Sequence, residues 1–201
     1  MRKKISTLFL IITMFGMVHA QQKALIIIDI QNDYFEGGNM PLVGSREAAI
    51  KAKGVLKYFR EKNLPIVHIQ HISNKEGAAF FLPGTKGVEI YDLVRPVEGE
   101  QIIEKHFPNS FLQTELQSYL SEKGITELVI CGMMTSMCVD ATVRAAKDLG
   151  YNCTLIADAC AAPNLGFDDK IVGGLDVNTA IVGALNYYYA RAIKAEDFIK
   201  E

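Results

Sequence analysis

Three chemically reactive side chains lie at the ends of short apolar runs that are far apart in the sequence. Asp29 follows Leu25–Ile28, Lys105 ends a second run, and Cys138 lies seven residues after Leu128–Cys131. Continuous apolar runs of this length are typical of strands that are buried on both faces. Because the carboxyl ends of parallel strands share one edge of a sheet, we expect the carboxylate, the amine and the thiol to meet there.

The sequence around Cys138 places a potential nucleophile at the start of a helix. Thr135 and Ser136 are candidate N-cap residues just ahead of it. Unpaired backbone N–H groups in a first helical turn stabilise a thiolate, and they also stabilise the oxyanion that forms when a carbonyl is attacked. Taken alone, Cys138 is equally compatible with a buried structural cysteine.

Lys105 and Asp29 supply the two charged groups that a cysteine nucleophile needs. The Lys105 ammonium could lower the pKa of the thiol by charge proximity and keep it ionised. The Asp29 carboxylate could take the thiol proton as a general base and return it to a leaving amine as a general acid. Each residue alone has a simpler interpretation, as a solvated lysine or as an Asx-turn residue that closes a strand. The three together favour covalent catalysis by cysteine.

The elements that would carry these residues alternate between strand and helix. Candidate strands are Ala24–Ile30, Pro65–Gln70, Gln101–Lys105, Glu127–Cys131 and Cys153–Ala157, with Ala192–Ala195 as a marginal sixth. Helical patterns run from Ser45 to about Lys62, over Gln113–Glu122 and Met137–Leu149, and from Asp176, a candidate N-cap, to about Tyr189. This alternation predicts a three-layer α/β fold, in which a mostly parallel sheet of six strands has helices on both faces. Residues 71–97 and 161–174 are rich in Gly and Pro, so we expect surface loops there that could shape a pocket.

The first twenty residues have the pattern of an export signal. Three basic residues at positions 2–4 precede an apolar stretch, Leu8 to Val18, that is too short for a convincing membrane span. We therefore expect residues 1–20 to be a signal peptide cleaved after Ala20, and residues 21–201 to form one domain with a single core. The mature protein would be periplasmic or secreted, without stable membrane association. A retained N-terminal anchor is the alternative.

The charge balance argues against a nucleic-acid partner. The full chain has 21 basic and 23 acidic residues, and removing residues 1–20 removes three basic residues, which leaves 18 against 23 and a net charge of −5. A mildly acidic chain without a basic block offers no electrostatic surface for nucleic acid. We therefore expect no nucleic-acid partner.

Four cysteines in an exported chain raise the question of disulfide bonds. Cys153 and Cys160 flank a candidate strand, and seven extended residues span about 23 Å, whereas bridged Cα atoms lie within about 7 Å of each other. Cys131 falls inside a buried strand, where it would act as a small apolar residue. We therefore expect no disulfide scaffold and a free thiol at Cys138.

Three segments of the chain together resemble the isochorismatase-like cysteine hydrolases. They are Leu25–Asp33 with its Asp-x-Gln-x-Asp pattern, Lys105–Phe111, and Cys131–Arg144. The resemblance covers nearly all of residues 21–201. It implies a hydrolase domain built on a six-stranded parallel sheet with helices on both faces.

The resemblance also implies roles for individual residues. Asp29, Lys105 and Cys138 would form the catalytic triad. A non-proline cis peptide just before Thr135 would turn backbone N–H groups of Met134, Thr135 and Cys138 toward the oxyanion. The implied reaction is hydrolysis of a C–N bond in a small amide, ureido or imide-like molecule through a thioester on Cys138.

Two other functions stay open. True isochorismatases cleave a vinyl ether, a reaction for which a thiol nucleophile is not obviously needed, so Cys138 favours amidase chemistry. A protein that binds a small molecule without catalysis is the alternative from a different class. Relatives commonly form dimers or tetramers, so we expect a homodimer or homotetramer, with Tyr187–Tyr189 either in an interface or packed on the sheet.

The expected substrate pocket has no metal. The residues expected to line it are Gln31, Phe35, His71 and Phe107. Nicotinamidases, which belong to the same family, hold a metal with an aspartate and several histidines after the second strand. Here His68 and His71 have no aspartate near them before Asp92, so the ligand count is short for a typical site. We therefore expect neither a metal nor another cofactor.

The export signal makes a direct prediction. N-terminal sequencing of the mature protein should begin at Gln21, because the small side chain of Ala20 suits cleavage there. An intact Met1 on the exported protein would contradict it.

Overall fold

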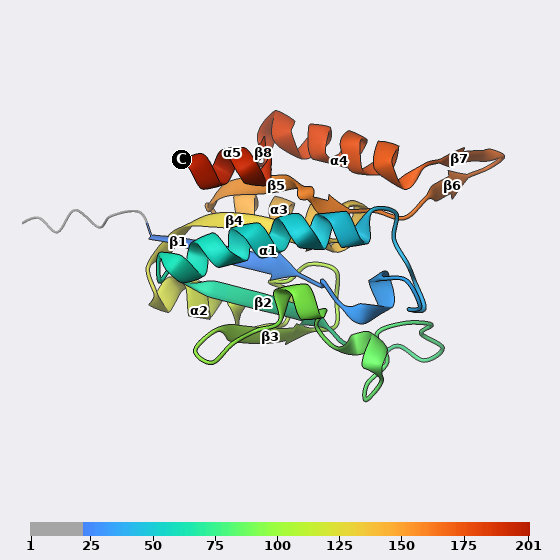
Figure 1. The fold of residues 1–201 in the computed structure, drawn as a ribbon, viewed down its shortest axis with the longest axis horizontal. Coiled ribbons are helices and arrows are strands. Elements are labelled where there is room, and N and C mark those ends of the chain that lie inside the picture. The colour runs from blue at the N-terminus through green and yellow to red at the C-terminus, as the bar shows by residue number, and fades with distance from the viewer. Residues whose placement is uncertain (1–21) are drawn as a thin grey trace, which may run out of the picture.

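The computed structural model describes residues 22–201 as one central sheet covered by helices (Figure 1). The sheet has the strand order β3-β2-β1-β4-β5-β8, and all five pairs of neighbours are parallel. Its strands are β1 (Gln22–Ile28), β2 (Ile66–His71), β3 (Gln101–Lys105), β4 (Ile125–Met133), β5 (Asn152–Ala161) and β8 (Arg191–Ile193). The six-stranded sheet expected from the sequence is confirmed. The expected signal peptide, residues 1–20, lies outside the described residues.

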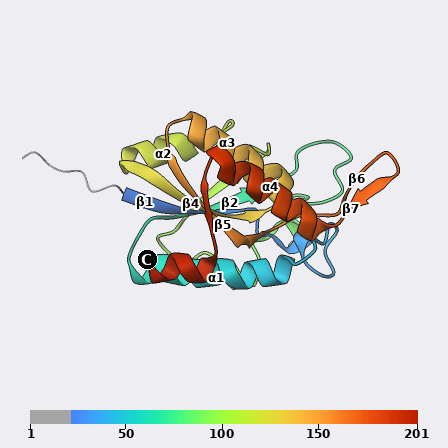
Figure 2. The same ribbon diagram turned by 90° about the horizontal axis from the view of Figure 1, so that it is seen from above.

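The helices form two layers on opposite faces of the sheet (Figure 2). On one face lie α1 (Ser45–Glu61) and α5 (Ala195–Lys200); on the other lie α2 (Leu116–Glu122), α3 (Asp140–Asp148) and α4 (Gly174–Tyr188). The sheet has a hydrophobic core on each face, and the side chains of β1 alternate between them. Leu25 and Ile27 pack toward α1, and Ala24, Ile26 and Ile28 pack toward the helices of the other face. Every side chain of the strand is therefore apolar from Ala24 to Ile28, as expected for a strand covered on both faces.

Several element boundaries differ from those expected. The predicted loop 161–174 contains a small antiparallel hairpin, β6 (Leu165–Phe167) with β7 (Lys170–Val172), and α5 was not anticipated. The predicted helix at Met137 begins earlier, as a π-helical turn η4 (Thr135–Val139) that continues into α3. The N-cap of α4 is Gly173, so Asp176 lies within the first turn instead. Residues 22–201 also contain three short 3₁₀ turns: η1 (Asn32–Tyr34), η2 (Lys86–Val88) and η3 (Asp92–Val94).

Large apolar side chains are exposed on the β6–β7 hairpin and on α4. The hairpin projects from one end of the molecule (Figure 1), and Phe167 and Ile171 on it are 87% and 80% exposed. Leu175 and Tyr187 of α4 are exposed as well, whereas the ring of Tyr189 lies against Arg144. Exposed apolar side chains that lie close together are typical of surfaces that contact another protein. The expected self-association stays a prediction.

Within the described residues, no helix combines the length and the apolar composition that crossing a membrane would require. All four cysteines are free and buried, and Cys131 lies in the core as expected.

The two central strands approach each other closely at their carboxyl ends. Ile28 of β1 pairs with Gly132 of β4, and Gly132 has a φ of +136°. A Cβ atom at Gly132 would overlap the backbone oxygen of Ile28. The next residue after Ile28 is Asp29, so this contact sets the separation between Asp29 and the turn that follows β4.

We predict that Gly132→Ala destabilises the protein by about 2–4 kcal/mol, because it adds a backbone clash to a conformation that favours glycine. Urea unfolding followed by circular dichroism measures the change. Gly183→Ala is the matched control, since Gly183 lies in α4 and a Cβ there meets no atom within 4 Å. It should stabilise the protein by about 0.5–1 kcal/mol. An unchanged free energy of unfolding for Gly132→Ala would contradict the argument.

Candidate active site

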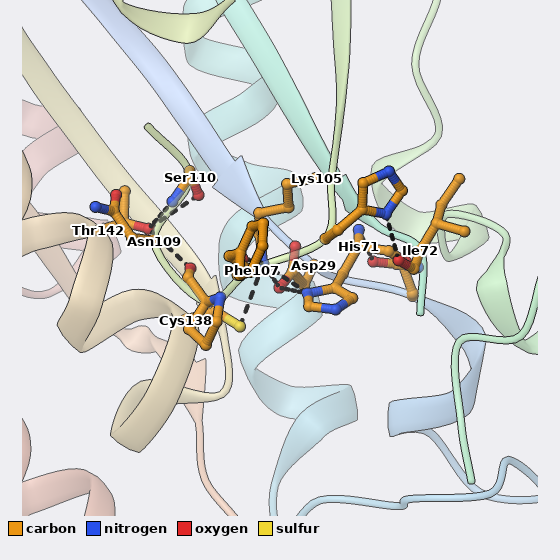
Figure 3. A network of polar contacts seen from close by, with 12 residues as sticks. Asp29, His71, Ile72, Lys105, Phe107, Asn109, Ser110, Cys138 and Thr142 are labelled. Carbon is orange, nitrogen blue, oxygen red and sulfur yellow. Dashed lines mark hydrogen bonds and ion pairs between the residues drawn. The ribbon is translucent and has the colours of Figure 1, made fainter. Parts of the chain in front are cut away.

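Asp29, Lys105 and Cys138 come together at the carboxyl edge of the sheet (Figure 3). Lys105 Nζ lies 2.7 Å from Asp29 Oδ2 and donates a hydrogen bond to Cys138 Sγ at 3.3 Å. Asp29 follows β1, Lys105 ends β3 and Cys138 lies in the turn after β4. All three side chains are buried. The convergence expected from the strand ends is therefore present in the fold.

Asp29 has an unusual backbone and an unsatisfied side chain. Its φ is 49°, in the left-handed region that only short polar residues and glycine adopt readily. Its N–H donates to Ile69 O at 3.1 Å, which ties it to β2. Neither carboxylate oxygen accepts a hydrogen bond of good angular geometry within residues 22–201. A buried carboxylate with free lone pairs is well suited to take a proton.

Charge and burial set the protonation of the three groups. Burial raises the pKa of Asp29, and the nearby ammonium of Lys105 only partly opposes this. Burial alone would lower the pKa of Lys105, but Asp29 and Cys138 outweigh it, so its pKa is raised and the amine stays charged. Burial raises the pKa of Cys138 far above its usual range; Asp29 adds to this and Lys105 opposes it. The resting thiol is therefore protonated, contrary to the expectation that Lys105 keeps it ionised.

The turn that carries Cys138 differs from the expected capped helix start. The residue at the N-cap position is Met134, and no side chain caps the turn. Thr135 Oγ1 instead donates to Asn178 Oδ1 of α4 at 2.6 Å. The cis peptide joins Met133 to Met134. Met134 O accepts the N–H groups of Met137 and Val139. The N–H groups of Met134 and Thr135 precede this first bonded turn, and no described residue accepts a hydrogen bond from either.

A second set of contacts joins the Lys105 strand to the Cys138 helix. Ser110, in the loop after β3, donates its N–H to Thr142 Oγ1 of α3 at 3.0 Å, and the two hydroxyl groups lie 2.9 Å apart. Both side chains are buried. This link is visible beside the site in Figure 3. It fixes the segment that follows Lys105 against the helix that follows Cys138.

Gln31 does not line a pocket as expected. Its side chain is fully buried and bonds to the backbone of His71 on both sides: Nε2 donates to His71 O at 2.9 Å, and Oε1 accepts His71 N–H at 2.8 Å. Asp33, the last residue of the Asp-x-Gln-x-Asp pattern, accepts N–H groups of Asn39 and Phe81. Of the three polar residues in this pattern, only Asp29 faces Cys138, while the other two hold loops.

The remaining expected pocket residues have different environments. Phe35 is buried and its ring stacks on Tyr91, with the two ring centroids 3.5 Å apart. Phe107 is partly exposed, and its carbonyl accepts a hydrogen bond from Lys105 Nζ at 3.1 Å. His71 Nδ1 lies 2.9 Å from the same Nζ atom. His71 and Phe107 are thus the expected pocket residues that directly contact the Lys105 ammonium.

Sequence reasoning missed Tyr34, which is buried beside the site. Burial raises its pKa well above the usual range, and the negative charges that Cys138, Asp29 and Asp33 carry when they are ionised add to this. Tyr34 lies within the motif that begins at Leu25, but nothing in its sequence spacing distinguishes it from a core aromatic residue.

His68 is a structural residue of β2. Its Nε2 atom lies 2.8 Å from Glu100 Oε2, and Glu100 also bonds to Arg60. Burial would raise the pKa of Glu100, but the hydrogen bonds from Arg60 and His68 lower it to about 2. His68 therefore takes part in this hydrogen-bonded network, as expected for a histidine that lies within a strand.

Asp29, His71 and Cys138 offer three atoms of metal-ligand type, all within 4.8 Å of one another. The Lys105 ammonium lies between them, at 2.7, 2.9 and 3.3 Å from those atoms. The ammonium is thus the cation around which these side chains are arranged.

We predict that Lys105→Met destabilises the protein by about 3–5 kcal/mol at pH 7, because it leaves the Asp29 charge buried and unpaired. The double variant Asp29→Asn/Lys105→Met should recover most of the loss, since it removes both charges. Urea unfolding measures both. Lys57→Met is the control, because Lys57 pairs with Glu61 on the exposed surface of α1, and its effect should stay within about 0.5 kcal/mol. A single Lys105 variant as stable as the wild type would refute the buried-pair argument.

The chain is similar to known proteins both in sequence and in fold. The isochorismatase domain profile matches residues 23–184. The Bacillus subtilis isochorismatase family protein YddQ is 49% identical over 177 residues, which cover 88% of this chain and 98% of YddQ. A solved hydrolase structure from Oleispira antarctica has a TM-score of 0.88 at 43% identity, and the match covers 92% of this chain and all of that one.

Two further relatives have descriptions that bear on function. The secreted isochorismatase effector Isc1 of Verticillium dahliae is 33% identical over 165 residues, with 82% of each chain covered. A streptothricin hydrolase of Streptomyces noursei is 33% identical over 141 residues, which cover 69% of this chain and 49% of the hydrolase. The family profile and the extent of these matches agree with the geometry of the site: this chain belongs to the isochorismatase family of hydrolases.

Proposed function

We propose that this protein hydrolyses a C–N bond of a small amide, ureido or imide-like molecule, with Cys138 as the nucleophile. The observation that carries the proposal is the contact of one buried ammonium, that of Lys105, with both the Asp29 carboxylate and the Cys138 sulfur. A carboxylate and a thiol held beside one fixed positive charge can exchange a proton without any net change in buried charge. Streptothricin hydrolase, a relative by sequence, supports hydrolytic chemistry.

The first half of the reaction forms a thioester. The Asp29 carboxylate takes the thiol proton while Cys138 Sγ attacks the carbonyl carbon, and the carbonyl electron pair moves to oxygen. Free N–H groups at Met134 and Thr135, together with that of Cys138, would stabilise the oxyanion. When the oxyanion collapses, the C–N bond breaks, and Asp29 gives its proton to the departing nitrogen. The products of this half are an amine and an acyl group on Cys138.

The second half consumes water and restores the enzyme. Asp29 takes a proton from water as the water oxygen attacks the thioester carbon. The C–S bond then breaks, the acid leaves, and Asp29 returns a proton to the Cys138 sulfur. The raised pKa of Asp29 suits this role, because a base whose pKa lies nearer the working pH transfers protons in both directions more readily.

Lys105 keeps the site neutral overall during these transfers. Its charge balances Asp29 in the resting state and the thiolate once Asp29 has been protonated. His71 and Phe107 would border the substrate, since both contact Lys105 and both are partly exposed. Vinyl ether cleavage stays the alternative reaction at the same site.

We also propose that the protein is exported after cleavage near Ala20. The relationship to the secreted effector Isc1 supports a role for this fold outside a cell.

We predict that Cys138→Ala lowers turnover of small amides, ureas or imides by roughly a thousandfold or more, because it removes the group that forms the intermediate. A substrate panel assayed by release of amine or ammonia tests this, and mass spectrometry should detect an acyl adduct on Cys138 during turnover. Cys153→Ala is the control, since Cys153 is also a free cysteine but lies at the start of β5; its activity should equal that of the wild type.

Three results would argue against this proposal. Retained activity in Cys138→Ala would exclude the covalent scheme. Release of pyruvate from isochorismate, with no turnover of the C–N substrates, would favour vinyl ether cleavage. Failure of Cys138 to react with any electrophile at neutral pH, together with no turnover, would favour a binding protein.

A further inference from the structure

The Lys105 ammonium determines where the proton of the His71 ring lies. An ammonium carries three N–H donors, and those of Lys105 go to His71 Nδ1 at 2.9 Å, Phe107 O at 3.1 Å and Cys138 Sγ at 3.3 Å. Since Nδ1 accepts a hydrogen bond from Lys105, it holds a lone pair rather than a proton. The single proton of the neutral ring therefore lies on Nε2.

The second nitrogen of the ring is an unpaired donor. Burial lowers the pKa of His71 to about 4, and the charges of Lys105 and His106 act in the same direction, so the ring is neutral at physiological pH. Nε2 has no hydrogen-bond partner among residues 22–201, and it is not one of the atoms there that are sealed from solvent. The side chain is 16% exposed. His71 thus presents one free N–H where a small molecule can reach it.

The backbone of His71 holds the ring in place. Gln31 accepts the N–H of His71 at 2.8 Å and donates to its carbonyl at 2.9 Å. His71 is also in direct register with Lys105 across β2 and β3. Figure 3 shows the ring close to Lys105 and Asp29, with the Cys138 sulfur on the other side of them. The imidazole is therefore fixed relative to the nucleophile.

Phe81 packs beside the His71 ring. The centroids of the two rings are 5.8 Å apart, and Phe81 is fully buried. Its φ is 56°, a left-handed conformation that is rare for a bulky residue and is found mainly at functional sites. Its N–H donates to Asp33 Oδ2 at 2.6 Å, and its carbonyl accepts the N–H of Ser73 at 2.9 Å. The loop after β2 thus folds back and holds Phe81 against His71.

The free N–H lies close enough to the nucleophile to contact the same small molecule. A ring nitrogen of His71, a carboxylate oxygen of Asp29 and Cys138 Sγ all lie within 4.8 Å of one another. A substrate whose carbonyl carbon is attacked by Sγ therefore extends past the ring with its next few atoms. A second carbonyl two bonds from the first, as in an imide or an acylurea, would bring its oxygen within hydrogen-bond reach of Nε2.

The charges around the ring favour a neutral acceptor. The charge of Lys105 is already balanced by Asp29, whose Oδ2 atom lies 2.7 Å from Nζ. The same carboxylate oxygen lies 3.9 Å from His71 Nδ1. A substrate carboxylate bound at Nε2 would bring a second negative charge close to Asp29, whose counter-ion is already in use, and this is costly at a buried position. A carbonyl oxygen accepts the same N–H without that cost.

We propose that His71 is a substrate-binding residue whose Nε2–H donates to a second, neutral carbonyl group of the substrate. The inference rests on the proposed function, since it takes Cys138 as the nucleophile, and it narrows the substrate class to imides and acylureas. A simple amide that lacks the second carbonyl would cover the Nε2–H without accepting from it. Such a molecule is discriminated against, because a covered donor without a partner loses its hydrogen bond to water.

The test uses three small amides. Diacetamide has a second carbonyl, N-ethylacetamide has a methylene in its place, and N-acetylglycine has a carboxylate. The measured quantity is the concentration of each compound that halves the rate of Cys138 alkylation by iodoacetamide at neutral pH, with Cys138→Ala as the background. This readout reports binding beside Cys138 whether or not the compound is hydrolysed. Where a compound is turned over, kcat/KM gives the same comparison.

Two substitutions separate the two nitrogens of the ring. His71→Asn can keep an oxygen near the position of Nδ1, and with it the bond to Lys105, but it has no N–H at the position of Nε2. His71→Gln can place an amide N–H near the position of Nε2. His106→Gln is the control on the neighbouring histidine, which is exposed and whose Nδ1 bonds to Ile72 O. Thermal unfolding shows whether each variant folds.

We expect the wild type to bind diacetamide about tenfold more tightly than N-ethylacetamide. This preference should fall to about twofold or less in His71→Asn and stay above about fivefold in His71→Gln and His106→Gln. N-acetylglycine should bind no more tightly than N-ethylacetamide. A merely structural role for His71 would change the binding of all three compounds together and leave the preference as it is in the wild type.

The same preference in the wild type and His71→Asn would overturn the inference, as would equal losses in His71→Asn and His71→Gln, or a wild type that does not distinguish diacetamide from N-ethylacetamide. Tightest binding of N-acetylglycine would overturn the choice of a neutral carbonyl. If His71→Asn fails to fold, His71→Phe, which keeps a ring without an N–H, decides the question. The predicted preference without hydrolysis of any C–N substrate would remove only the proposed reaction, whereas hydrolysis without the preference would remove only the role of His71.

Discussion

The buried pair of Asp29 and Lys105 is the interaction on which the site depends. Two opposite charges 2.7 Å apart with no exposed surface are costly to remove from water, and their attraction repays that cost only if the geometry is held closely. The pair does not act by making the resting thiol acidic. Burial and the charge of Asp29 outweigh the ammonium, so the pKa of Cys138 is raised. The pair instead allows a proton to pass from the Cys138 sulfur to the Asp29 carboxylate while the total charge of the site stays constant.

The surrounding fold supplies that geometry through contacts between segments that are distant in sequence. The approach of β1 to β4 at Ile28 and Gly132 places Asp29 next to the turn of Cys138. The link from Ser110 to Thr142 holds the segment after Lys105 against α3. Each of these contacts uses a small or polar residue at a place where a larger side chain would change the distance between reacting atoms. The apolar strands stabilise the fold, and these few contacts position the reacting side chains.

The sequence was sufficient to predict the sheet and the meeting of Asp29, Lys105 and Cys138 at its edge, because both predictions follow from local patterns. Ala24 to Ile28 is an unbroken apolar run that ends in an acid, and such an acid must lie at the mouth of a buried strand. It was not sufficient for Gln31 and His71, whose roles depend on a contact across forty positions. The same holds for Thr135, which looks like a helix cap but bonds to Asn178 of another helix.

Shorter elements escaped prediction for a related reason. The strands β6 and β7 have three residues each, too few to establish a period, and the π-helical form of η4 leaves no mark in composition. The position of the resting proton also could not be predicted. It depends on the depth of burial of Cys138, which is a property of the assembled layers rather than of the Cys138 motif.

The left-handed backbone at Asp29 has a consequence for how this family can change over evolution. A φ of 49° is tolerated by aspartate, asparagine and glycine far better than by other residues. Conformation therefore admits three residue types at this position, while proton transfer admits one. A descendant that abandons hydrolysis has a short mutational route, through asparagine or glycine, that silences the chemistry and keeps the backbone conformation, provided that the buried Lys105 ammonium is replaced as well. Such a lineage would be recognisable from paired changes at positions 29 and 105, while its folded domain remained free to take up a new role in binding.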